Sequence, residues 1–170
     1  LLFGYNLARE SIYQSKEIII TEGYLDVVML HQAGFTNSVA TLGTALTSQH
    51  IPLLKKSDAK VILGYDGDKA GQNAAFKASV MLSQNGFDGG VVIFENGADP
   101  ADMVKDRKIE ELEELFSNPT PFANFAISYI VSSYNINNPV EKQKALSEAN
   151  EYLSSLSQLY QEEYKRFLAQ

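Results

Sequence analysis

Acidic residues follow three apolar, β-branched runs of the sequence, at or soon after the point where each run ends. These acids are Glu22, Asp66, Asp68, Asp99 and Asp102. Carboxylates that meet within a few ångströms repel one another unless a cation lies between them. Mg²⁺ prefers oxygen ligands, keeps several waters, and is often held by one or two carboxylates plus substrate phosphates. If the three run ends meet, the sequence predicts a site for Mg²⁺, with Mn²⁺ as a substitute.

Each acid taken alone has a plainer interpretation. Asp-Gly and Asp-Pro are common turn sequences, in which the carboxylate accepts hydrogen bonds from nearby backbone N–H groups. Asp66 and Asp68 flank Gly67, which allows a tight turn between two ligands. Receiver-type and phosphatase-type domains also place aspartates at strand ends, so the spacing alone leaves several magnesium chemistries open. Convergence of all three loops is what favours a metal site.

The elements that would position these acids alternate between strand and helix. We expect strands at 17–21, 38–41, 60–65 and 90–94, and helices near 25–33, 48–55 and 70–84. Alternating strands and helices predict an α/β fold, with a mostly parallel sheet of about four strands flanked by helices. In such sheets, ligands bind beyond the carboxyl ends of the strands. The three acidic loops should therefore lie at one edge.

The pattern changes beyond Asn118, where no further strand is indicated. Helices are expected at 122–134, 139–156 and 159–168, and Pro119 and Pro121 mark the junction. The chain is therefore predicted to have two parts, a catalytic α/β domain at 1–118 and a helical subdomain at 119–170.

Composition narrows the classes of function. The net charge of −7 argues against a generic DNA-binding surface, because non-specific affinity for nucleic acid comes from Lys and Arg. Bound metal ions would reverse the local field. The absence of cysteine excludes disulfides, thiolate zinc sites and cysteine nucleophiles, and agrees with a reducing cytoplasm. No apolar run approaches the roughly 18 residues of a membrane span, so we expect a soluble protein with no membrane partner.

Four segments resemble the Toprim motifs of bacterial DnaG-type DNA primases. They are EGYLDVV at 22–28, ATLGTALT at 40–47, YDGDKAG at 65–71 and DPADMV at 99–104. The EGYxDVV and LGT elements are typical of the primase branch, whereas topoisomerases, recombination mediators and overcoming-lysogenization nucleases share mainly the glutamate and the DxD pair. The opening LLFGYNLA is also similar to primases. The resemblance covers 1–118 well and the helical remainder more weakly.

The resemblance implies that Glu22, Asp66, Asp68 and Asp99 are metal-site residues. It makes the first three catalytic, with Glu22 serving as ligand or general base. One position departs from the family pattern, because primases have a second acid where this chain has Ala101. Either Asp102 takes over that role or one peripheral metal site is weakened.

The implied function is that of a fragment of the RNA polymerase core of a cytoplasmic bacterial primase. A ribonucleotide 3′-hydroxyl would attack the α-phosphate of a ribonucleoside triphosphate on a single-stranded DNA template and expel pyrophosphate, making short RNA primers. Two alternatives stay open, a Toprim nuclease and a noncatalytic magnesium-binding interaction module.

The resemblance also implies parts that this chain lacks. Zinc is expected only in an N-terminal domain, and the replicative helicase would bind through a C-terminal domain, both absent here. We expect the isolated chain to be monomeric and weakly active at most.

Four other residues have weaker functional interpretations. Asp26 could orient the site or simply interact with the helix dipole. Lys69 could contact phosphate, although a lone lysine after a turn is usually only solvated. His31 and His50 have no partner at metal-ligand spacing, so we expect them to be surface or packing residues.

Overall fold

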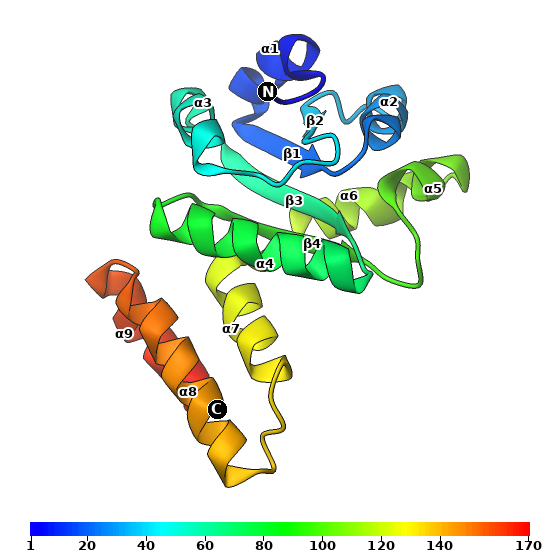
Figure 1. Cartoon of the computed structure of the whole chain (residues 1–170). Helices are drawn as coiled ribbons and strands as arrows, with labels where there is room; N and C mark the ends of the chain where they lie inside the picture. Colours follow the sequence, from blue (N-terminus) through cyan, green and yellow to red (C-terminus); the bar gives the residue numbers. More distant parts are fainter.

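The computed structural model describes residues 1–170 and contains one five-stranded sheet (Figure 1). The strands are β1 (Glu17–Thr21), β2 (Ser38–Ala40), β3 (Lys60–Asp66), β4 (Gly89–Phe94) and β5 (Thr120–Pro121). Their order is β2-β1-β3-β4-β5, and all pairs are parallel except β4 with β5. The predicted α/β class and the four expected strands are confirmed. The two-residue β5 was not expected, since so short a segment containing proline gives no strand pattern.

Helices cover both faces of the sheet, as a parallel sheet requires. On one face lie α1 (Tyr5–Ser15), α3 (Ile51–Ser57), which follows the short 3₁₀ helix η1 (Ser48–His50), and α4 (Lys69–Gln84). On the other lie α2 (Tyr24–Gln32), α5 (Pro100–Lys105) and α6 (Ile109–Ser117). Successive strand residues alternate between the two cores, so Ile18 and Ile20 contact the first group while Ile19 contacts the second.

Two of these helices were not predicted from the sequence. In α1, only Ala8 and Ile12 are buried. In α6, Leu112 and Phe116 form an inward pair one turn apart, surrounded by glutamates. Both patterns are too sparse to be separated from a polar loop.

The last three helices form a third core against α4. They are α7 (Phe122–Ser132), α8 (Pro139–Ser154) and α9 (Gln158–Leu168), and they lie at the positions expected for helices (Figure 1). Phe76 of α4 stacks on Tyr129 of α7, with ring centroids 4.6 Å apart. Tyr152 of α8 is also tied to α4, since its hydroxyl lies 2.6 Å from the Ser83 hydroxyl. No helix combines the length and the apolar character needed to cross a membrane.

Candidate metal centre

The strand order brings Glu22 and Asp66 to adjacent positions at the carboxyl edge of the sheet. After β1, the chain forms β2 on one side and then crosses to form β3 on the other, so the strand order reverses between β1 and β3. Such a switch point is where open α/β sheets bind ligands. The register pairs Ile20 with Leu63, so Glu22, two residues further on, lies beside Tyr65 and next to Asp66.

One carboxylate oxygen of Glu22 lacks a hydrogen-bond partner. Its Oε1 atom is buried and makes no hydrogen bond. Burial raises the pKa of Glu22, and the negative charges of Asp66 and Asp68 raise it further, while the nearby Asp66 backbone N–H partly offsets the rise. An unpaired buried carboxylate oxygen is costly, and a cation at this position would satisfy it.

Asp66 and Asp68 supply the second loop of the site. Burial raises the pKa of Asp66, followed by repulsion from Asp99 and Asp68. Asp68 caps α4, because its Oδ1 accepts a hydrogen bond of 2.6 Å from the Gly71 backbone N–H. The turn interpretation is therefore correct for Asp68, but the cap uses only one of its two carboxylate oxygens.

Gly67 and Gly71 allow the backbone of this loop to pack closely. A Cβ atom on Gly67 would lie 2.2 Å from the Phe94 carbonyl oxygen at the end of β4. A Cβ atom on Gly71 would lie 2.2 Å from the Asp66 carbonyl oxygen. Glycine is needed at both positions because the neighbouring backbone leaves no room for a side chain.

The third loop contributes Asp99, which lies near Asp26. Asp99 caps α5 by accepting a 2.7 Å hydrogen bond from the Asp102 N–H. Asp26 is buried in the first turn of α2, and its Oδ1 accepts a hydrogen bond of 3.2 Å from the Ala101 N–H. Burial, and then the charge of Asp99, raises the pKa of Asp26 to about 6. Asp26 is thus closer to the other acids than its sequence context indicated.

Asp102 is the predicted acid that the structure does not bring together with the others. Its side chain is exposed, and none of the charge effects on Glu22, Asp26 or Asp66 comes from it. Moreover, no three acidic or histidine side chains are close enough to enclose a metal ion by themselves. Mutual charge effects nevertheless place five acids near one another at the carboxyl edge of the sheet, here called the acidic rim: Glu22, Asp26, Asp66, Asp68 and Asp99. Such a rim fits a cation that keeps waters and takes further ligands from phosphates.

A pocket of about 240 Å³ opens beside Glu22. Its walls include Thr41 and Thr44 from the loop after β2, and Tyr65 from β3. Burial and the charge of Glu22 raise the pKa of Tyr65. Sequence reasoning missed Tyr65, whose only signal was its position immediately before Asp66.

The side chains of the remaining candidates are exposed or bonded to nearby backbone. Lys69 is exposed at the first position of α4. His31 Nε2 lies 2.9 Å from the Ser38 carbonyl oxygen, and His50 Nδ1 accepts a hydrogen bond of 3.0 Å from the Thr47 N–H. Both histidines bond to backbone atoms of nearby segments, which supports their interpretation as packing residues.

Family comparisons agree with this architecture. The family model described as Toprim-like matches residues 19–104, which hold all the acids of the rim. The model described as the DnaB-helicase binding domain of primase matches residues 123–170. A helicase-binding part was expected only outside this chain, whereas the matched segment comprises almost all of α7, α8 and α9.

Individual relatives and solved structures that are similar to this chain are also DNA primases. A DNA primase of Helicobacter pylori (strain J99) is 54% identical over 169 residues, which cover 99% of this chain and 30% of that protein. The DnaG primase catalytic domain bound to ssDNA matches with a TM-score of 0.87 and 27% identity, over 99% of this chain and 56% of that one. The RNA polymerase domain of Mycobacterium tuberculosis DnaG with double-stranded DNA matches with a TM-score of 0.80 and 29% identity. The match covers 99% of this chain and 55% of that one. This chain thus spans about 30% of the length of the Helicobacter primase.

Proposed function

Because the chain belongs to the Toprim-like family, in its DNA primase branch, we propose that it is the metal-binding catalytic part of a primase. That enzyme is a DNA-directed RNA polymerase that makes primers for DNA replication. The family implies use of a divalent metal, and we propose Mg²⁺, with Mn²⁺ able to replace it. The substrates would be single-stranded DNA template and ribonucleoside triphosphates.

One observation carries this proposal. Glu22 from the end of β1 and Asp66 from the end of β3 repel each other at the switch point, and Glu22 Oε1 has no hydrogen-bond donor. All available ligands are oxygens, which suits a hard cation. The metal site would comprise Glu22, Asp66, Asp68 and Asp99, with the first three as catalytic residues.

In the reaction, the protein would act mainly by holding the metal ligands and the nucleotide in place, and would form no covalent bond to the substrate. Strands β1 and β3 hold Glu22 and Asp66 side by side, and the Asp68 cap fixes the start of α4. A bound divalent ion supplies charge neutralisation for the phosphates and a lower pKa for the attacking 3′-hydroxyl. The pocket lined by Thr41, Thr44 and Tyr65 would orient the nucleotide beside the rim.

The test is Mn²⁺ binding followed by electron paramagnetic resonance. Glu22→Gln and Asp66→Asn should each weaken Mn²⁺ binding by about tenfold or more, equivalent to about 1.4 kcal/mol or more. Glu113→Gln on the exposed face of α6 is the matched control and should bind like the wild type. Template-directed RNA synthesis by the longer primase with the same substitutions should fall in parallel. Equal Mn²⁺ binding by all four proteins would contradict the proposal.

We further propose that 1–118 and 119–170 act as separate domains, and that α7 to α9 contact the replicative helicase. The support is the match of the helicase-binding model to residues 123–170. Binding of this chain to purified replicative helicase, measured by interferometry, tests the contact. Removal of the exposed Leu159 side chain by Leu159→Ala should weaken it, whereas Asp66→Asn should not.

A further inference from the structure

A lysine-lined pocket lies at the amino ends of β1, β3 and β4, at the opposite end of the sheet from the acidic rim. Its volume is about 440 Å³, and its charged lining residues are Lys16, Lys55, Lys60, Asp58 and Asp88. Three ammonium groups therefore meet two carboxylates, in a chain whose net charge is −7. The exposed Lys56 adds a further positive charge next to Lys55 on α3.

Two of these lysines lie over aromatic rings instead of being paired with acids. Lys55 Nζ is 5.4 Å from the centroid of the Phe87 ring, and Lys16 Nζ is 5.9 Å from that of Tyr13. A cation held over a ring keeps its charge available to a further anion. The third, Lys60, begins β3 beside Glu17 of β1. Burial raises the pKa of Glu17, and the charge of Lys60 partly offsets that rise.

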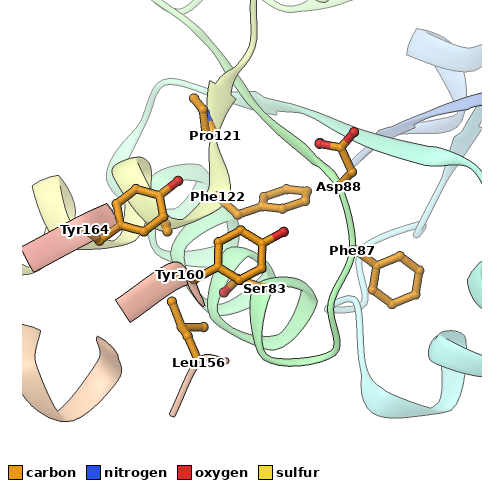
Figure 2. Close-up of a pocket in the computed structure, with 10 residues that line it drawn as sticks. Ser83, Phe87, Asp88, Pro121, Phe122, Leu156, Tyr160 and Tyr164 are labelled. Atoms are coloured by element: carbon orange, nitrogen blue, oxygen red, sulfur yellow. The ribbon is translucent and has the colours of Figure 1, made fainter. Parts of the chain in front are cut away.

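An aromatic pocket adjoins the lysine-lined one. It is small, about 80 Å³, and its aromatic walls include Tyr160 and Tyr164 of α9 and Phe122 of α7 (Figure 2). The two tyrosine rings are 6.5 Å apart and inclined by 22°. Tyr160 is 41% exposed, so its face can be reached from solvent.

The loop at 86–89 separates the two pockets and takes part in both. Phe87 and Asp88 line each of them. Figure 2 shows the Phe87 ring pointing away from Phe122 and the tyrosines, consistent with its contact to Lys55 on the lysine side. Positive charge and the exposed ring of Tyr160 therefore lie in adjoining pockets that share Phe87 and Asp88.

We propose that these two pockets, named here the amino-end surface, form a second binding site for single-stranded nucleic acid. Ammonium groups at Lys16, Lys55 and Lys60 would contact successive phosphates, and Tyr160 would stack on a base. Basic grooves combined with aromatic platforms are how proteins bind single strands without sequence preference. An acidic peptide would satisfy the lysines but would offer no base to the tyrosines. The seven residues of β3 put this surface roughly 20 Å from the rim.

The experiment measures fluorescence anisotropy of a labelled dT oligonucleotide of about twelve bases, long enough for one such site. It uses the full chain in EDTA and about 25 mM salt, so that no metal-mediated contact forms at the rim and screening is weak. The combined variant Lys16→Gln, Lys55→Gln, Lys60→Gln should bind about tenfold more weakly. The slope of log binding constant against log salt concentration should also be shallower. It should change by about 0.7 for each phosphate that a lysine no longer neutralises, and thus by about 2 for the three lysines.

Three further variants test whether the oligonucleotide binds at the amino-end surface. The variant Lys108→Gln, Lys142→Gln, Lys144→Gln removes the same charge elsewhere and should bind like the wild type. Tyr160→Leu keeps apolar packing but removes the ring, and should weaken binding about fivefold, the low end for removal of one stacked ring. Asp66→Asn alters the rim and should leave binding in EDTA unchanged. Circular dichroism confirms that each variant is folded.

Several results would overturn the proposal. One is equal loss of binding in the two triple-lysine variants, and another is a wild-type chain that does not bind the oligonucleotide. Unchanged binding by Tyr160→Leu, with polyglutamate competing as well as the oligonucleotide, would indicate an acidic protein partner instead. None of these results depends on Mn²⁺ binding, so this inference and the proposed metal site can fail separately.

Discussion

Acidic residues gather in two regions of this protein, the rim at the carboxyl edge of the sheet and the outer face of α6. Helix α6 carries Glu110, Glu111, Glu113 and Glu114, which are all exposed. It is the denser acidic segment in the sequence. At the rim, by contrast, Glu22 and Asp66 are only partly exposed and come from positions far apart in the chain.

The difference lies in what surrounds the charges. The α6 glutamates are solvated, and those in its first turn interact favourably with the helix dipole. At the rim, burial and mutual repulsion raise the pKa values of Glu22, Asp26 and Asp66. Acidic density along a sequence therefore does not locate a metal site. Separate strands that end in partly buried carboxylates are the better guide.

The largest expected effect comes from Gly67→Ala, because the rim depends on close backbone packing. The added Cβ would lie 2.2 Å from the Phe94 carbonyl oxygen, so β4 or the loop must move. We expect the free energy of unfolding to fall by about 3 kcal/mol, as measured by urea denaturation.

Two controls define this effect. Glu113→Ala on α6 should change stability by about 0.5 kcal/mol at most. Gly64→Ala, in the same strand as Asp66, places a Cβ 3.3 Å from the Phe116 ring and should cost less than Gly67→Ala. If Gly67→Ala is no more destabilising than Gly64→Ala, the backbone around Gly67 can move to accept a side chain, and close packing does not fix the rim.

The next prediction concerns Asp26, whose pKa of about 6 lies above the ordinary value of about 3.9. Between about pH 4 and 6 the folded protein holds a proton that the unfolded chain has lost, so stability falls as pH rises through this window. Asp26→Asn removes this contribution and can still accept the Ala101 hydrogen bond. Relative to the wild type, the variant should therefore gain about 2 kcal/mol between pH 4 and 7.

Urea titrations in EDTA at several pH values measure this gain. Glu113→Gln is the control, because an exposed acid on α6 should give a curve parallel to that of the wild type. A parallel curve for Asp26→Asn as well would mean that Asp26 titrates normally, and the contrast between the two acidic regions would disappear.

A smaller effect is expected from Mn²⁺ on thermal stability. A ligand that binds only the folded state at about tenfold above its Kd stabilises by about 1.4 kcal/mol. For a protein of this size, Tm should rise by about 3 to 5 °C. Differential scanning fluorimetry should detect the full rise in the wild type and in Glu113→Gln, but only about 1 °C or less in Asp66→Asn, whose Mn²⁺ binding is about tenfold or more weaker. A full rise in all three would place the ion elsewhere.

The same contrast explains how much could be predicted from the sequence. Strand β3 and its Asp66 were correctly located, because a β-branched apolar run followed by Asp-Gly is a strong local pattern. Glu22 was paired with it through the rule for strand ends and the resemblance to primases. These signals are local, or depend only on the order of the strands.

What the sequence left open depends on tertiary packing. Asp26 looked like an ordinary first-turn acid, and only its burial against the Ala101 N–H reveals its link to the rim. Tyr65 borders the pocket because β1 and β3 bring it beside Glu22. The lysine-lined pocket joins the lysine-rich segment 55–60 to Lys16 and to the loop at 85–88, and only the fold brings these three distant segments together.

The smallest effect is predicted for Asp102. This chain has Ala101 where primases have an acid, and Asp102 was the candidate to replace that acid as a metal ligand. Asp102 is exposed and supplies only its backbone N–H to the Asp99 cap, so Asp102→Asn should change Mn²⁺ affinity by less than about threefold, or about 0.7 kcal/mol. Asp99→Asn should weaken it more, although asparagine still caps α5. Similar losses in both variants would mean that Asp102 replaces the missing acid. Loss at Asp99 alone would place Asp102 with the solvated acids of α6.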